Sequence, residues 1–484
     1  MNIAGIQPRV IRWRKPIDAD IKTLNLDLSH ADRSKAFASH QRQLSILAEI
    51  GVPIAEGAET AKEYAIDLLR VAAEVEHALM VQYLYTANSV VAGSSGEENY
   101  QRKILNIAIQ EMGHFATVQN LLVLLGGPDA VYVQRDVYRA NSDKNPIPFI
   151  LEPLTRTVLA KYVAAEMPAE PPAQLADQVK KLVALAKQDS GIEPHRVGAI
   201  YTVLEWLFME EKDAVRFLNL VALVPELGKY PHLTDADLST PADIAAYQAD
   251  KEEWDGAADW PSLLIEPARS RQEAVAAIRL IAEQGEGFEG NEESHFHEFI
   301  EMFDAFEAGK VRTKSIATSP DLGTGHGAER PTLITSSFTK LWGQVFSLQY
   351  TLIVLTIQHA IRTPRGTSQD PGLRKEIADL AMRGMRKIVE AVSAILANLP
   401  LEDGGAQVAG PPFDLDPADL IVSDPAGLPA RQIDLLDKLE PLYIEIQNSA
   451  EFGKDSDYRI EVANLRNMDK LRRQLFENQP IPTA

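Results

Sequence analysis

The sequence contains no cysteine. Disulfides, zinc sites built on thiolates, iron–sulfur clusters and a cysteine nucleophile are therefore excluded. Histidine and the carboxylates remain as the strong metal ligands, so any metal bound by these side chains is a hard or borderline ion.

Basic residues are also scarce relative to acidic ones. The 48 Lys and Arg face 69 Asp and Glu, which gives a formal net charge of −21. Nucleic acids and anionic membranes are bound through basic patches, so this balance disfavours both as partners. The N-terminus lacks the apolar core of a signal peptide, and the longest apolar run, around 345–357, is too short to span a bilayer. We therefore expect a cytoplasmic protein that acts on a small-molecule substrate.

Helical periodicity is the strongest pattern that the sequence does contain. Long helices are predicted at 60–91 and 100–127, joined by a short link that favours an antiparallel hairpin. A proline-rich connection with two shorter helices, 152–167 and 172–188, leads to a third long helix at 194–225. A fourth is expected from 270 to 284, is interrupted by GEGFEGNEE, and resumes at Ser294, which is placed to cap the new start.

Glu-x-x-His pairs mark several of these helices. Residues three apart share one helix face, so a carboxylate and an imidazole can reach the same ion. The motif also arises by chance, and a buried ion pair or a hydrogen-bonded histidine is the alternative. The middle pair stands out because apolar residues surround it, and a buried carboxylate needs a partner. The pairs are Glu74/His77, Glu111/His114 and Glu292/His295.

Two hairpins joined by a long crossover, with Glu and His on their inner faces, form the architecture of the ferritin-like bundle. The helix segments VEHALMVQYLYTANSV and IAIQEMGHFATVQNLLVLLGGP, with the shorter pieces AAEMP, GEG, SHFHEF and AGPPF, are more specific. In these segments, over about 61–413, the chain resembles ferritin-like proteins of the iminophenyl-pyruvate dimer synthase type, found in violacein and bisindole pathways. The resemblance implies oxidative chemistry in secondary metabolism on an aromatic amino-acid-derived imine, or at least an oxygen- or peroxide-handling metal centre.

Carried over by position, the resemblance implies a set of metal ligands on the first, second and fourth predicted helices. These are Glu76, Glu111, His114, Glu286 and His295. In an unbroken helix the last two would lie about 13 Å apart along the axis, so they can share an ion only if the chain bulges out between them. Glu292 with His295 is the competing pair.

The third predicted helix departs from the family pattern. The family has an acid two residues before the tyrosine that matches Tyr201, whereas this chain has Ala199. We therefore expect one metal to be held well and a second weakly or not at all. Glu205 is expected to replace the missing acid, and Glu166 in the crossover is the other candidate. His77 is expected to be a core histidine or to lie behind the ligands.

We thus predict an all-α chain in four parts. These are an N-terminal arm at 1–58, a ferritin-like four-helix bundle with the metal site at 59–312, a linker at 313–331 and a C-terminal helical part at 332–484. The expected function is that of a metal-dependent oxidoreductase that activates oxygen or peroxide. Its metal is expected to be mononuclear or dinuclear iron, and manganese and zinc are the alternatives. A structural or binding protein with a partial or empty metal site is the alternative, and a homodimer is possible.

Overall fold

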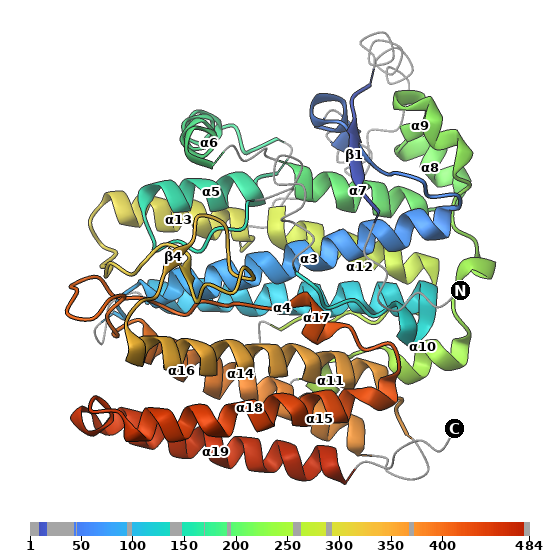
Figure 1. The fold of residues 1–484 in the computed structure, drawn as a ribbon. Coiled ribbons are helices and arrows are strands. Elements are labelled where there is room, and N and C mark those ends of the chain that lie inside the picture. The colour runs from blue at the N-terminus through green and yellow to red at the C-terminus, as the bar shows by residue number, and fades with distance from the viewer. Residues whose placement is uncertain are drawn as a thin grey trace.

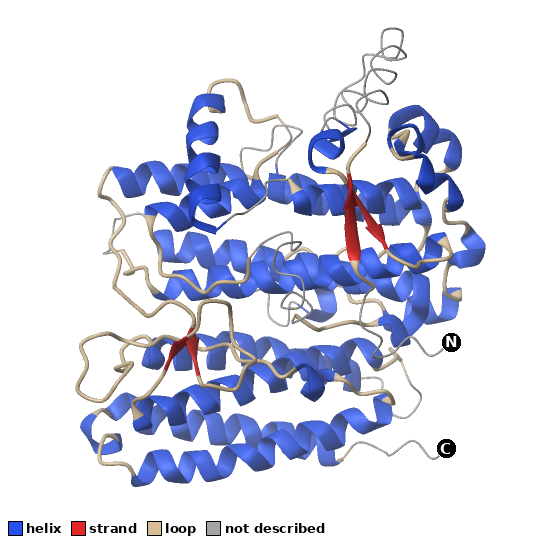
Figure 2. Ribbon diagram, turned by 45° about the horizontal axis from the view of Figure 1, so that its top comes forward, coloured by secondary structure: helices blue, strands red, loops and turns tan. Residues whose placement is uncertain are grey.

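The computed structural model describes residues 9–16, 43–44, 46–93, 99–135, 148–168, 170–190, 195–254, 263–286, 293–366 and 372–478. Helices make up nearly all of the regular structure, and the two strand pairs are short (Figures 1 and 2). The all-α fold class is therefore confirmed. Among the described residues no helix has both the length and the apolar character needed to cross a membrane.

A central hairpin of two long helices organises the molecule. Helix α3 (Ala61–Asn88) begins where the Thr60 side chain accepts a hydrogen bond from the Glu63 amide. Helix α4 (Tyr100–Gly126) begins at Asn99 in the same way and ends at Gly127, whose φ of 66° favours glycine. Both helices are buried around most of their circumference because further helices cover the hairpin on two sides (Figure 1).

One covering layer completes the four-helix bundle. It contains α5 (Arg156–Glu166), α7 (Arg196–Phe208), α12 (Arg271–Glu286) and α13 (His295–Glu307). Helix α12 ends at Glu286, and Ser294 caps α13 by accepting a hydrogen bond from the His297 amide, while most of the predicted interruption between them is not described. Residues 287–292 lie outside the described part of the chain.

The prediction of one continuous third helix over 194–225 is wrong. Helix α7 ends at Phe208, and the chain continues as α8 (Glu211–Phe217) and α9 (Leu220–Leu223). At the break, Met209 has extended backbone angles and is buried. No glycine or proline marks this position, so periodicity alone could not locate the turn.

The C-terminal helices form the second covering layer, on the other side of the hairpin. They are α14 (Ser337–Arg362), α15 (Leu373–Gly384), a π-helical turn (Met385–Val389), α16 (Glu390–Leu396), α18 (Leu428–Asn448) and α19 (Ser456–Glu477). Helix α14 lies toward the hairpin, and α18 and α19 pack beyond it (Figure 1). The apolar core runs without a break from the hairpin into these helices.

Two short strand pairs and several short helices complete the fold. Strand β1 (Ile11–Arg14) pairs antiparallel with β2 (Val52–Ala55), an element that the sequence analysis did not predict. Strands β3 (Pro320–Asp321) and β4 (Thr332–Leu333) form a parallel pair at the start of the C-terminal part. Further α-helices are α6 (Ala176–Ser190), α10 (Pro241–Tyr247), α11 (Lys251–Trp254) and α17 (Pro417–Leu420).

Candidate metal centre

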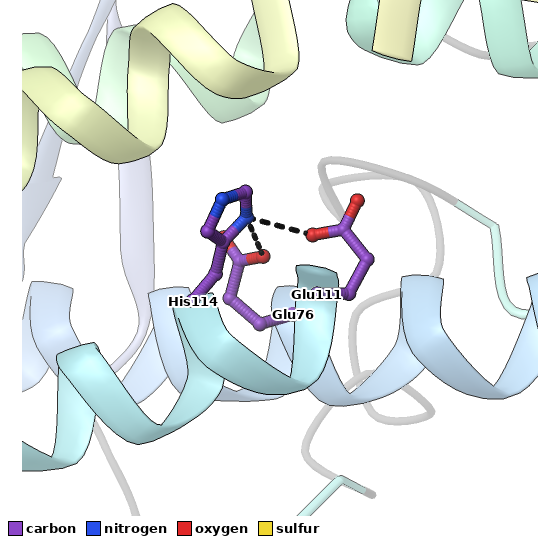
Figure 3. Close-up of side chains that lie close together, drawn as sticks. All are labelled: Glu76, Glu111 and His114. Atoms are coloured by element: carbon purple, nitrogen blue, oxygen red, sulfur yellow. Dashed lines mark hydrogen bonds and ion pairs between the residues drawn. The ribbon is translucent and has the colours of Figure 1, made fainter. Parts of the chain in front are cut away.

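Carboxylate and imidazole groups converge between the hairpin and the layer of α5 and α13. Helix α3 supplies Glu76, α4 supplies Glu111 and His114, α5 supplies Glu166 and α13 supplies His295. All five side chains are buried, with relative exposures of at most 6%. Figure 3 shows the side chains of α3 and α4 turned toward one another.

The carboxylate of Glu111 stands at the centre of this cluster. Its Oε2 lies 2.9 Å from His114 Nδ1, and its Oε1 lies 2.9 Å from His295 Nδ1. A second carboxylate approaches each ring, because Glu76 Oε2 is 3.5 Å from His114 Nδ1 and Glu166 Oε2 is 3.7 Å from His295 Nδ1. Two sets of possible metal ligands result, each with ligand atoms within 4.8 Å of one another, and Glu111 belongs to both.

The two histidines are oriented in the same way by glutamines. His114 Nε2 lies 2.9 Å from Gln284 Oε1, and His295 Nε2 lies 2.9 Å from Gln110 Oε1. An amide oxygen only accepts hydrogen bonds, so each Nε2 carries a proton and donates it. Loss of the Nδ1 proton then leaves a neutral imidazole with a lone pair facing the cluster, which is the form that binds a metal.

Tyrosines hold the outer carboxylates. The Tyr201 hydroxyl donates a hydrogen bond to Glu76 Oε1, and the Tyr83 hydroxyl donates one to Glu166 Oε1 at 2.5 Å. In both cases the other carboxylate oxygen, Oε2, is the one that faces the histidine. Each half of the cluster therefore has the same parts: one tyrosine-held glutamate, one glutamine-held histidine and a share of Glu111.

The geometry around His295 fits a bound cation better than a closed hydrogen-bond network. His295 Nδ1 and Glu111 Oε1 approach each other without hydrogen-bond geometry, and neither atom has another hydrogen-bond partner among the described residues. Buried polar atoms are rarely left in this state. A cation between the two atoms would satisfy both, because oxygen and imidazole nitrogen are ligands that iron, manganese and zinc accept.

Without a cation, the buried groups hold protons instead. Burial raises the pKa of Glu76 to about 8, with the Glu111 carboxylate adding to the effect. Burial alone would lower the pKa of His295, but the Glu111 carboxylate outweighs it and raises this pKa to about 9. The pKa of His114 is raised by the same carboxylate against the effect of burial. Burial alone would raise the pKa of Glu111, but His295 and His114 outweigh it, so this pKa is lowered.

Most of the predicted ligands come together, but the third-helix prediction requires correction. Glu76, Glu111, His114 and His295 lie in the cluster, whereas Glu205 does not. The carboxylate of Glu205 is buried in α7 and accepts a hydrogen bond from Arg279 Nε at 2.6 Å. Its place is taken by Glu166 in the crossover helix, the residue that the sequence analysis ranked as the other candidate. The side chain of Glu286 and the whole of Glu292 lie outside the described residues.

Sequence reasoning did not identify the groups that orient the ligands. Tyr83 and Gln110 lie in the two helix segments that carry the family resemblance, and Gln284 directly precedes the GEG piece, but no role was assigned to any of the three. Gly285 belongs to GEG, one of the short segments that resemble the family, and this was a weak sign of a role near the cluster. A Cβ atom there would lie 3.0 Å from Glu166 Oε2, so glycine leaves room for that carboxylate.

The remaining Glu-x-x-His pair of α3 lies outside the cluster. Glu74 is buried and accepts a hydrogen bond from the Tyr132 hydroxyl at 2.7 Å. His77 is a buried histidine whose Nε2 lies 2.6 Å from the Tyr350 hydroxyl. This contact agrees with the expectation of a core histidine rather than a ligand.

Comparison with known proteins agrees with this geometry. Residues 69–304 match the family model described as Ferritin-like, so this part of the chain is a ferritin-like domain, the class that the helices and the carboxylate–histidine cluster also define. Dichlorochromopyrrolate synthase of Lentzea aerocolonigenes is 23% identical over 420 residues, which are 76% of this chain and 38% of that protein. The chain thus corresponds to well under half the length of this relative. No solved structure matches the chain. The predicted family resemblance is confirmed.

Proposed function

We propose that the chain is a metal-dependent oxidoreductase whose ferritin-like domain holds two metal ions on either side of Glu111. The observation that supports this most directly is the duplicated ligand set, in which Glu76 with His114 and Glu166 with His295 share the central carboxylate. Ferritin-like proteins with two-metal carboxylate sites use the same side-chain types on facing helices. Iron is the first choice of metal, with manganese as the second.

The negative charge of the cluster favours the binding of divalent cations. Three ionised glutamates contribute −3 and two neutral histidines contribute nothing, so two divalent ions give −3 + 4 = +1. Uncompensated carboxylates in such a buried place would be costly, and their alternative is to bind protons. The raised pKa values of Glu76 and His295 report this competition between protons and cations. Zinc would fit the ligands but offers no redox change.

Iron in this position would supply redox chemistry toward dioxygen or peroxide. The protein's own part is to hold the ligands. Gln110 and Gln284 keep the Nε2 protons in place, and Tyr83 and Tyr201 fix the outer carboxylates. The surrounding apolar helices exclude bulk water from the cluster, which strengthens each electrostatic contact there.

An aromatic, amino-acid-derived imine is the substrate class that we propose. The resemblance to the iminophenyl-pyruvate dimer synthase type supports this assignment, and the relative is a synthase by its name, dichlorochromopyrrolate synthase. Because the chain corresponds to only 38% of that relative, the proposed activity rests on the metal cluster and not on the whole relative.

Metal content tests the proposal. Protein purified without chelator and reconstituted with ferrous iron should contain close to two equivalents of iron by elemental analysis, and Glu111→Gln should lose most of it. Glu74→Gln is the matched control, because Glu74 is a buried acid on α3 outside the cluster. Wild-type protein that binds no iron, manganese or zinc would rule out the oxidoreductase and leave the structural or binding protein as the better account.

A further inference from the structure

A partly open cavity lies on the other side of the α3–α4 hairpin from the metal cluster. The cavity has a volume of about 350 Å³ and lies between the hairpin, α14 and the helix that contains the π-helical turn. Neighbouring residues of the hairpin face the metal cluster and the cavity. Glu76 and Glu111 belong to the cluster, whereas the residues that follow them, His77 and Met112, line the cavity. The volume falls within the range of small-molecule sites.

Aromatic rings form one continuous wall of this cavity. The distances between ring centroids are 5.5 Å from Phe115 to His77, 5.9 Å from His77 to Tyr350 and 5.2 Å from Tyr350 to Phe413. The last two steps are edge-to-face. Such a wall offers both ring faces and ring edges to another aromatic ring.

Three methionines, Met80, Met112 and Met385, also line the cavity. Their sulfur atoms make favourable contacts with aromatic rings, and their flexible side chains adapt to a bound molecule. The lining therefore favours an aromatic ligand over an aliphatic chain.

The Tyr350 hydroxyl of the aromatic wall is paired on both sides. Arg135 Nη1 donates a hydrogen bond to the Tyr350 hydroxyl at 3.3 Å, and that hydroxyl lies 2.6 Å from His77 Nε2. Because Arg135 donates to the Tyr350 oxygen, the Tyr350 hydroxyl donates its own proton to His77 Nε2. Because Nε2 accepts, Nδ1 of His77 carries the ring proton, and this atom has no hydrogen-bond partner among the described residues.

Ser393 on α16 offers a second buried polar atom without a partner. It lines the cavity, only 1% of it is exposed, and its hydroxyl has no hydrogen-bond partner among the described residues. A buried hydroxyl without a partner is unusual and unfavourable. A polar group on a bound molecule would supply the missing hydrogen bond.

The helix that carries Ser393 has an unusual backbone where it borders the cavity. Met385 and Val389, the first and last residues of the π-helical turn, line the cavity together with Ser393 one turn later. Single π turns inside helices occur frequently at functional sites. Because the turn changes the helical register, it determines which side chains of this helix face the cavity.

We propose that this cavity binds a small aromatic molecule with one hydrogen-bonding group, with its ring against the Phe115–Phe413 wall and its polar group at Ser393. The site is separate from the metal cluster and does not depend on the proposed oxidoreductase function. It uses the interface between the ferritin-like domain and the C-terminal helices, and it gives those helices a binding role.

Equilibrium dialysis with 2-naphthol, a neutral aromatic alcohol, tests the proposal. We expect saturable binding of one molecule per chain, in metal-free and in metal-loaded protein alike. Ser393→Ala should weaken 2-naphthol binding by about three- to tenfold, the usual effect of one hydrogen bond. It should leave the binding of naphthalene, which has no hydroxyl, unchanged.

A blocking variant tests the location. Ala394 is exposed at the edge of the cavity, so Ala394→Trp should abolish 2-naphthol binding without disturbing the core. Ala391→Trp on the same helix is the matched control because Ala391 does not line the cavity, and thermal unfolding verifies that each variant is folded. Undiminished 2-naphthol binding by folded Ala394→Trp, or by Ser393→Ala, would overturn the proposal. Tighter binding of 1-decanol than of 2-naphthol by the wild type would overturn the aromatic assignment.

Discussion

At the scale of single residues, the protonated Nε2 atoms of His114 and His295 determine what the cluster can bind. Each is fixed by a glutamine oxygen at 2.9 Å, which turns Nδ1 toward Glu111. Groups that orient metal-binding histidines usually contribute about 10- to 100-fold to metal affinity. The two glutamines should therefore contribute to metal affinity, although neither belongs to the two sets of possible ligands.

We predict that Gln284→Leu weakens iron binding by about 10- to 100-fold, because the His114 ring loses its acceptor. Gln284→Glu keeps an acceptor oxygen in the same place and should retain most of the affinity. Competition with a calibrated chelator measures both. Equal affinities of wild type and Gln284→Leu would show that the glutamine does not orient the ligand.

The protons held by the metal-free cluster predict a pH dependence of stability. Glu76 has a pKa of about 8 in the folded chain instead of 4.5, and His295 has one of about 9 instead of 6.5. In both cases the folded state binds protons that the unfolded state has released, so the free energy of unfolding decreases as pH rises from about 5 to 9. The lowered pKa of Glu111 acts only below this window.

Thermal unfolding of metal-free protein should therefore occur at lower temperature at pH 9 than at pH 6. The double variant Glu76→Gln/His295→Gln should show a smaller decrease, because both substituted groups no longer titrate. A melting temperature of the metal-free wild type that rises over this range would contradict the assigned proton positions.

At the scale of elements, helix α4 depends on a close contact with the chain that precedes α12. A Cβ atom at Gly113 would lie 2.2 Å from the Leu264 carbonyl oxygen, so only glycine allows this approach. On the same helix the Thr117 hydroxyl accepts a hydrogen bond from the Glu266 amide at 3.0 Å. The segment is therefore fixed against the helix that carries Glu111 and His114.

Gly113→Ala should lower the free energy of unfolding by about 1–3 kcal/mol, the usual cost of overpacking a core. The gain in helix propensity from Gly to Ala is about 1 kcal/mol and offsets only part of this loss. Urea denaturation measures the difference. A variant as stable as the wild type would show that the segment around Leu264 can move away at no cost.

Much of the helical architecture was predictable because the helix termini carry local signals. Thr60, Asn99 and Ser294 cap helices through their own side chains, and Gly127 ends α4, so these boundaries lie close to the predicted ones. The end of α7 at Met209 depends on tertiary packing and carries no such signal. The β1–β2 pair was missed for the same reason, since four-residue strands have little periodicity of their own.

The candidate site was predictable where its residues share a helix. Glu111 and His114 lie three residues apart, so their spacing alone placed them together. Glu166 comes from the crossover and reaches the cluster only through the packing of α5 against α13, which the sequence pattern does not specify. The family pattern, with an acid on the third helix, favoured Glu205 instead, and the ion pair of Glu205 with Arg279 was not foreseeable from spacing.

At the scale of the whole molecule, the bundle and the C-terminal helices share one apolar core. Polar contacts also cross between them, including His77 with Tyr350 and Asp129 with Arg362. The boundary at 313–331 stays a prediction about sequence organisation. The shared core predicts that the two parts unfold together in a single calorimetric transition. Two well-separated transitions, one for each part, would contradict this expectation.

Anomalous diffraction from crystals of the iron-reconstituted protein measures whether two ions lie around Glu111. We expect two iron peaks, one bounded by Glu76, Glu111 and His114 and the other by Glu111, Glu166 and His295. A single peak in only one ligand set would contradict the duplicated site and support the weaker second metal expected from Ala199. Well-diffracting crystals with no iron peak near Glu111 would contradict the metal centre itself.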